Sequence, residues 1–451
     1  MPFKSAPGAM RHGAILAALA LTGLVLSGCS HGPKKAGGPK TPIFGERTSI
    51  LGGTELGKAD ETLSETPVIV PDPVENADWP QPGGAASKAV GGVALGAGTK
   101  RVWEASISGG STRAKLASAP VVAGGRLYVI DSEAVIHAFD AKTGKPIWDK
   151  SVRAPDDTGH IEFGGGVSVE GDKLYASTGT GDVLALQASD GKILWSVRPG
   201  GPLRGSPTIS LGNVYVMSQD NQLYALNETD GAVVWQDSGT IQSTGVFGVA
   251  APAAAQGSVV AGYSSGELSA YRYENGRALW GDALSRTNIS TSVSTLTDID
   301  ADPVIDRGRV FAIGEGGRMA SYELVSGQRL WELNIGGIAT PLVAGEWVFV
   351  ATDKGRLYCI ARTAGKVRWI SELGGFRDPK GKKNPIRWYG PILAGGKLIL
   401  VSTAGRMAFV NPADGKILSQ RAIGDGVSLP PVVADKMLYL LTQNGRLIAY
   451  R

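Results

Sequence analysis

The sequence predicts an all-β fold: an eight-bladed β-propeller of four-stranded antiparallel blades, with the last blade closed by an N-terminal strand. Three observations support this fold class. A unit of roughly 40–50 residues repeats along most of the chain. Glycine accounts for 64 of 451 residues and charged residues for only 19%, a composition that suits many tight turns. The last unit lacks one strand, and a spare strand lies near the other end of the chain.

The N-terminus (residues 1–28) has the layout of a secretory signal peptide. Lys4 and Arg11 carry positive charge, and an apolar run then extends from Ala14 to Leu26, too short for a comfortable bilayer span. The run ends in Leu26-Ser27-Gly28-Cys29, which resembles the bacterial lipobox, in which the cysteine is diacylated and becomes the new N-terminus. The alternative is an ordinary signal cut near Gly28 that leaves a free thiol on Cys29.

A lipid on Cys29 predicts a membrane-anchored protein, because each buried methylene contributes about 0.8 kcal/mol. Ser30 follows the cysteine where an aspartate would favour retention in the inner membrane, so the expected location is the periplasmic face of the outer membrane. Residues 29–78 are rich in Pro, Gly, Lys, Thr and Glu and predict a flexible tether. Two apolar islands, Ile43-Phe44 and Val68-Ile69-Val70, could dock on the domain or on a partner.

The repeated unit is clearest at its end, where a turn glycine is followed four positions later by a tryptophan. Each unit opens with a proline and apolar residues and contains four short strands, the signature of a propeller blade. We expect these tryptophans to be structural wedges between blades, each contributing about 3–5 kcal/mol if fully buried; the alternative is a set of cofactor platforms. The blade tryptophans are Trp103, Trp148, Trp195, Trp235, Trp280, Trp331 and Trp369. In one unit Ser419 takes the tryptophan's place.

The ends of the chain complement each other. The eighth unit starts at Pro430 and stops one strand short at Tyr450, whereas residues 100–105 read as a fourth strand that carries Trp103. Pairing the two would close the ring and remove two exposed sheet edges. The propeller domain is therefore expected to span residues 79–451.

The proline-led opening and the Gly-Lys-x-x-Trp ending resemble the PQQ-type β-propeller repeat over about residues 100–451. Within this superfamily, the lipobox and the eight blades resemble the BamB family, lipoproteins of the outer-membrane β-barrel assembly machinery. The segments around Leu203-Arg204 and Asp298-x-Asp300 resemble the family's partner-binding segments. The resemblance implies that they bind the POTRA domains of BamA, with other assembly-complex subunits and nascent outer-membrane proteins as further partners. Gly201 stands where the family has a second leucine, which weakens the apolar part of this contact.

The repeat geometry places these two segments together. Each immediately precedes the opening strand of a blade, and such inter-blade connections all emerge on one propeller face. Arg204 and the Asp298/Asp300 pair are therefore expected on the same face, two blades apart. The alternative from the residues alone is that both aspartates are solvated turn residues and that Arg204 caps a strand.

Residues typical of catalysis are sparse. His137 occupies a repeat column that holds Leu, Tyr or Ser elsewhere, and Cys359 a column of small residues, so both read as structural. The Asp298–Asp302 stretch lacks the glycine and glutamate of a calcium loop, so no metal is expected. The two cysteines are not adjacent, which argues against quinone chemistry, so neither a cofactor nor catalysis is expected. The formal charge of +4 shows no basic stripe for nucleic acid.

The sequence thus predicts a non-catalytic scaffold of outer-membrane protein assembly that aids the insertion of β-barrel proteins. Two alternatives remain open: a periplasmic PQQ-dependent dehydrogenase-like enzyme and a lipoprotein that binds glycan or peptidoglycan. The basic insertion at residues 376–389 also stays open. It could contact anionic lipid, peptidoglycan or a partner, or be a solvated loop.

Overall fold

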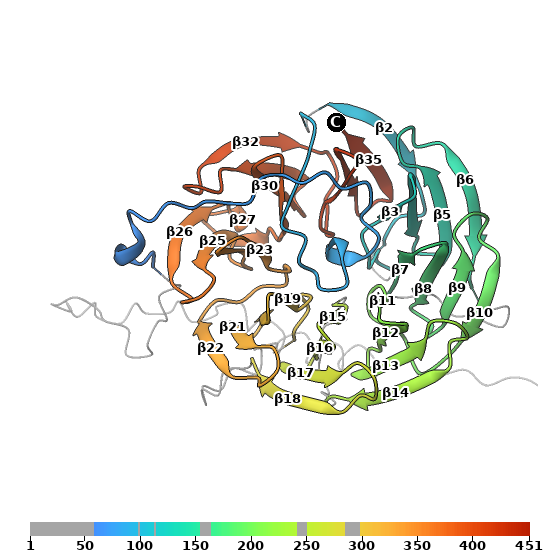
Figure 1. The fold of residues 1–451 in the computed structure, drawn as a ribbon. Helices are drawn as coiled ribbons and strands as arrows, with labels where there is room; N and C mark the ends of the chain where they lie inside the picture. The colour runs from blue at the N-terminus through green and yellow to red at the C-terminus, as the bar shows by residue number, and fades with distance from the viewer. Residues whose placement is uncertain (1–57, 98–99, 112–113, 154–163, 241–249, 285–297) are drawn as a thin grey trace, which may run out of the picture. The chain divides into compact units, whose positions relative to one another are not determined.

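A computed structural model describes residues 58–97, 100–111, 114–153, 164–240, 250–284 and 298–451. The predicted signal peptide, Cys29 and the tether up to residue 57 lie outside these ranges. Within them, eight antiparallel blades of four strands each form a ring and are numbered here along the chain (Figure 1); in one of them a fifth, parallel strand, β1 (Gly92–Val93), adds to the inner edge. This confirms the predicted fold class. No helix in the described ranges is long and apolar enough to cross a bilayer.

Each blade runs from the central channel outwards. The inner strands are β3 (Val121–Ala123), β7 (Gly165–Glu170), β11 (Thr208–Ser210), β15 (Ala253–Ala255), β19 (Val304–Asp306), β23 (Leu342–Ala344), β29 (Trp388–Ala394) and β33 (Val432–Ala434). The second strands are β4 (Arg126–Ile130), β8 (Lys173–Thr178), β12 (Asn213–Met217), β16 (Ser258–Gly262), β20 (Arg309–Gly314), β24 (Trp347–Ala351), β30 (Lys397–Ser402) and β34 (Met437–Leu441).

The third strands are β5 (Val135–Asp140), β9 (Val183–Gln187), β13 (Gln222–Asn227), β17 (Glu267–Arg272), β21 (Arg318–Glu323), β25 (Arg356–Ala361), β31 (Arg406–Val410) and β35 (Arg446–Tyr450). The outer strands are β6 (Pro146–Ser151), β10 (Ile193–Val197), β14 (Val233–Ser238), β18 (Ala278–Ala283), β22 (Arg329–Leu333), β26 (Val367–Glu372), β32 (Ile417–Ala422) and β2 (Arg101–Ser106). Outside the blade pattern lie β1 (Gly92–Val93), β27 (Phe376–Asp378), β28 (Lys383–Pro385) and the 3-10 turns Glu61–Leu63 and Pro82–Gly84.

The eighth blade joins the two ends of the propeller. Strand β2 pairs antiparallel with β35, and Trp103 lies opposite Ala449. The sheet order β2-β35-β34-β33 is therefore completed by an N-terminal strand, as predicted. The interior strands are almost wholly buried, whereas an outer strand such as β2 alternates exposed and buried positions because one of its faces meets a neighbouring blade; β32 is exposed throughout.

Inside each blade, the tryptophan faces a small residue on the third strand. Trp148 pairs with Ala138, Trp331 with Ser321 and Trp369 with Cys359. A bulge in the outer strand pair lies next to this position. The small-residue column seen in the sequence therefore makes room for the indole. Cys359 is fully buried, and burial raises the pKa of its thiol, as expected for a packing residue.

Between blades, all seven tryptophans make the same contact. Each indole N–H donates to a backbone carbonyl of the next blade, over 2.8–3.2 Å. Each ring also covers that blade's turn glycine, such as Gly365, whose φ is +68° and where a Cβ would lie 2.7 Å from Trp331. The positive φ and the close approach of the indole ring each require glycine in this turn.

Blade 7 departs from this pattern for a structural reason. Ser419 replaces the tryptophan, and Phe409 replaces the small residue opposite it, so the size complementarity is inverted. The following blade has no turn between its third and outer strands, because its outer strand is β2, which precedes blade 1 in the sequence. A tryptophan at position 419 would have no turn glycine to cover.

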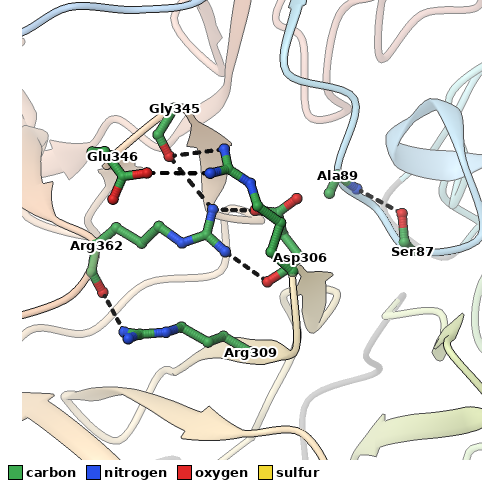
Figure 2. Close-up of polar contacts among 8 residues, drawn as sticks. Ser87, Ala89, Asp306, Arg309, Gly345, Glu346 and Arg362 are labelled. Atoms are coloured by element: carbon green, nitrogen blue, oxygen red, sulfur yellow. Dashed lines mark hydrogen bonds and ion pairs between the residues drawn. The ribbon is translucent and has the colours of Figure 1, made fainter.

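A partly buried ion pair joins blades 5 and 6 (Figure 2). The side chain of Arg362, only 4% exposed, contacts the carboxylate of Asp306 and donates to its backbone carbonyl over 2.7 Å. The Arg362 carbonyl in turn accepts from Arg309 at 3.2 Å, and it also accepts from Trp331 at 2.8 Å. Arg362 thus connects the ion pair with Asp306 to the tryptophan contact at the same blade interface.

The chain before β2 crosses the central channel (Figure 1). Residues 71–93, called the strap below, bond to the inner strand in seven blades. The inner-strand residues that bond to the strap are Val433, Val122, Val169, Ile209, Ala254 and Ile305, and in β29 the strap pairs at Leu393 and Ala394. Asp78 accepts from the backbone of Gly124, a turn residue between first and second strands. The strap therefore closes the channel on the face that carries these turns.

The segment before the strap also lies on the propeller, although residues up to 78 were expected to be tether. The backbone N–H of Asp60 donates to Val367 over 2.7 Å, and Val68 is buried among residues of blades 6 and 7. Of the two apolar islands, Val68-Ile69-Val70 thus docks on the domain, while Ile43-Phe44 lies outside the described residues. The sequence of this segment contains no repeat that would predict the docking, because the docking depends on single residues.

Candidate functional site

The propeller face opposite the strap carries the connections between blades, and we call it the connection face. Leu203 and Arg204 lie there before β11, and Asp298 and Asp300 lie before β19. The structure brings the two segments together, as the repeat geometry predicted. All four side chains are buried, however: Leu203 and Arg204 are 0% exposed, Asp298 1% and Asp300 8%. These side chains are therefore not exposed on the connection face.

Backbone bonds explain the burial of Leu203 and Arg204. The Arg204 N–H donates to Met217 over 2.8 Å, and its carbonyl accepts from Gly165 over 2.7 Å. Backbone hydrogen bonds thus hold the segment between blades 2 and 3, and both side chains are buried. Arg204 Nη1 donates to the carbonyl of Gly262 at the end of β16, over 3.2 Å. Gly201, where the resembling family has leucine, faces open space.

The charges of this site influence each other strongly. Burial lowers the pKa of Arg204, and the nearby Asp300 and Asp298 oppose that shift. Burial raises the pKa of Asp300 to about 7; Arg204 counteracts the shift, whereas Asp298 and Glu315 add to it. Asp300 therefore exchanges its proton near neutral pH.

Two further residues, which the sequence did not single out, extend this cluster. Glu315 follows β20, and one of its oxygens is bonded by Arg387 Nη1 at 3.0 Å. Carboxylate oxygens of Asp298, Asp300 and Glu315 lie within 4.8 Å of one another, a spacing that could hold a metal ion. Two arginines already supply positive charge here, so the cluster alone does not call for a metal. Glu315 lies in a glycine-rich turn that gives no functional signal in the sequence.

A second buried pair lies deeper in the channel. Lys88, from the strap, is 4% exposed, and its Nζ donates to Thr208 Oγ1 over 2.9 Å. Burial lowers the pKa of Lys88 to about 8, opposed by Asp302. Asp302 accepts from the backbone of Ala251 over 2.8 Å, and its own pKa is raised by burial. Asp302, the third aspartate of the Asp298–Asp302 stretch, thus stabilises the charge of Lys88 in the strap.

The basic insertion forms a hairpin of β27 and β28 on the connection face. Residues 377–385 are exposed, including Lys380, Lys382 and Lys383. Its base is fixed: Ile386 is 2% exposed, and the Trp388 indole donates to Gly374 over 2.9 Å. The structure therefore presents the three lysines on a structured support.

His137 lies away from these sites, on β5. Its two ring nitrogens lie 2.7 Å from Asp149 and 3.0 Å from Asp131. Burial alone would lower the pKa of His137, but the hydrogen bonds to Asp131 and Asp149 outweigh it and raise the pKa. His137 thus completes a structural ion-pair network.

This network predicts a pH-dependent stability. A raised folded-state pKa means that the His137 contribution is complete below its unfolded pKa of about 6.5 and is lost as pH rises through the folded value. Replacing His137 by Gln should therefore destabilise the protein more at about pH 6 than at about pH 9. Urea unfolding of both proteins at the two pH values measures this, and a difference that grows with pH would contradict it.

The fold family also implies a quinone in the channel. The strap closes one face, and the cavity that remains has a volume of about 130 Å³; it is lined by Lys88, whose ammonium group already donates to Thr208, and by the carboxylates of Asp300 and Asp302. Pyrroloquinoline quinone carries carboxylates of its own and would be repelled by those of Asp300 and Asp302. The residues at this place do not fit the cofactor.

Comparisons with known proteins agree with this geometry. The family model described as "Outer membrane protein assembly factor BamB" matches residues 88–158 and 132–371. The protein of that name from Escherichia coli strain K12 is 29% identical over 347 residues, covering 76% of this chain and 86% of its own. The one from Yersinia pestis is 27% identical over 355 residues, covering 78% and 88%.

Solved structures show the same fold. The crystal structure of BamB from Moraxella catarrhalis superposes with a TM-score of 0.66 at 18% identity, covering 78% of this chain and 99% of that one. A europium-containing methanol dehydrogenase gives 0.64 at 14% identity, covering 81% and 89%. Fold alone therefore does not separate assembly factors from enzymes. The family match and the curated relatives do: the chain belongs to the BamB family of outer membrane protein assembly factors.

Proposed function

We propose that this chain is a lipid-anchored, non-catalytic scaffold that binds the POTRA domains of BamA through its connection face and so aids the insertion of β-barrel proteins. Lipidation of Cys29 would hold it at the periplasmic face of the outer membrane. The observation that carries the proposal is the meeting of the Leu203-Arg204 and Asp298-Asp300 segments on one face of a BamB-family propeller. Other assembly-complex subunits and nascent outer-membrane proteins are further proposed partners.

Burial assigns these four residues a positioning role within the proposed interface. Arg204 neutralises Asp298 and Asp300 where the connections before β11 and β19 approach each other. It thereby holds exposed neighbours such as Pro202 in place. An Arg204→Glu change would add a buried carboxylate beside two others and disturb the fold itself. Tests of the interface therefore need exposed residues.

The basic hairpin offers such residues. Replacing Lys380, Lys382 and Lys383 by Gln removes three exposed charges without touching the buried base. If the hairpin meets an acidic surface of the partner, affinity for the purified POTRA region should fall about tenfold, or about 1.4 kcal/mol, at low salt. Calorimetry measures this, and the loss should shrink as salt increases.

A matched control uses three lysines of the opposite face. Lys145, Lys192 and Lys397 are all exposed and lie at or beside turns there. Their replacement by Gln changes the net charge equally and should leave the affinity within about twofold. Equal losses in both triple variants would show that overall charge, not the connection face, governs binding. Failure of the unaltered protein to bind would overturn the proposed partner.

A further inference from the structure

A cavity of about 130 Å³ lies in the central channel between the strap and the carboxylate cluster. The strap contributes Trp79 and Lys88 to its lining, and the blades contribute Ser206 and Asp300. This volume approaches that of an engineered cavity of about 150 Å³ that binds benzene. The cavity is therefore large enough for a small organic molecule.

Two polar atoms of residues that line the cavity have no hydrogen-bond partner among the described residues. They are Ser206 Oγ and Asp300 Oδ1, from residues that are only 4% and 8% exposed. Buried polar atoms are normally bonded, since an unmet one carries a free-energy penalty. A bound molecule could supply the partners that these two atoms lack. The rest of the lining is mainly proline, alanine and branched aliphatic residues.

The charged residues around the cavity determine whether it favours an anionic or a cationic ligand. The carboxylates of Asp298, Asp300 and Glu315 gather at one end, opposed by Arg204 and Arg387. At the other end Asp302 faces the ammonium group of Lys88, which already donates to Thr208. Carboxylates outnumber cations, so an anionic ligand is disfavoured and a cationic one is attracted.

We infer that this cavity is a binding site for a small organic cation, with an ammonium group that donates to Asp300 and Ser206 and an apolar body about the size of a benzene ring. The body packs against the prolines and aliphatic side chains of the lining. The charged group replaces the partners that these two buried oxygens lack. This inference does not depend on the proposed binding of POTRA domains.

The protonation of Asp300 supports a pH dependence. With its pKa at about 7, Asp300 is ionised at about pH 8 and mostly protonated at about pH 6. Lys88, with a pKa of about 8, loses charge over the same rise, which also favours a cation. Arg204, Arg387, Asp298 and Glu315 face Asp300 and set its pKa.

The test compares benzylammonium with benzyl alcohol, which matches it in size but is uncharged. Calorimetry on the whole mature chain at about pH 8 should show benzylammonium binding at least about tenfold more tightly. At about pH 6 the preference should fall about tenfold, since only about one-tenth of Asp300 stays ionised. Asp300→Asn should bring the affinity for the cation down to that for the alcohol.

Two further variants guard against indirect effects. Asp353→Asn removes a half-buried carboxylate, whose pKa burial raises to about 6 but which does not line the cavity, and should leave binding unchanged. Ala339→Leu fills the cavity and should abolish binding of both compounds. Equal binding of cation and alcohol, unchanged affinity in Asp300→Asn, or no binding at all would overturn the inference. The last result would mean that water alone fills the cavity.

Discussion

Deleting residues 1–107 is expected to destabilise the propeller far more than deleting residues 1–57. The longer deletion removes β2, and with it the burial of Trp103 against blade 1, a loss on the order of 3–5 kcal/mol. It also exposes β35 as a new sheet edge. In addition it removes the strap, whose backbone and side chains bond to inner strands of seven blades. The shorter deletion removes none of these contacts.

Thermal unfolding of the two truncated proteins measures the difference. An intermediate truncation that removes residues 1–97 keeps β2 but lacks the strap, so it separates the two effects. We expect its melting temperature to lie between those of the other two proteins. The inner strands lose their hydrogen bonds to the strap, but β2 still closes the ring. Equal melting temperatures for all three proteins would show that neither the strap nor the shared blade stabilises the ring.

Replacing Trp331 by Ala is expected to lower the free energy of unfolding by about 3–5 kcal/mol. Its ring is 8% exposed, covers the turn glycine Gly365, and donates to the carbonyl of Arg362. The change leaves a cavity and an unmet carbonyl at one blade interface. Urea unfolding monitored by circular dichroism measures the loss.

The control lies at the equivalent position of blade 7. Ser419→Ala should change stability by less than about 0.5 kcal/mol, because Ser419 lies on an exposed strand. A similar effect from both substitutions would contradict the wedge role of the tryptophans. A loss well below 1 kcal/mol for Trp331→Ala would do the same.

The blades could be predicted because their pattern repeats. Turn glycines, tryptophans and small residues recur at fixed spacing, and each recurrence has a local cause in the structure, such as the space that Ala138 leaves opposite Trp148. Closure was also predictable, since a missing strand at one end matched a spare strand at the other. Family resemblance then drew attention to Leu203, Arg204, Asp298 and Asp300, and repeat geometry placed them on one face.

What escaped prediction does not repeat. The strap bonds mainly through backbone groups, so its sequence carries no periodic signal, and Lys88 reads as an ordinary charged residue until Asp302 faces it. The burial of Arg204 depends on connections from blades 2, 3 and 4 meeting in space. Glu315 joins the carboxylates only through the curvature of the ring. These features arise from tertiary packing, which one sequence does not display.

The path of the strap has a mechanical consequence. A force applied at residue 58 does not pull on the free edge of one blade, where hydrogen bonds would open one after another. It first loads Asp60 and Val68 at blades 6 and 7, and then a line of bonds across the channel to blades on every side. Many bonds must then yield before β2 is loaded. A protein held by its N-terminal end should therefore withstand tension that would unzip a propeller attached through its outer strand.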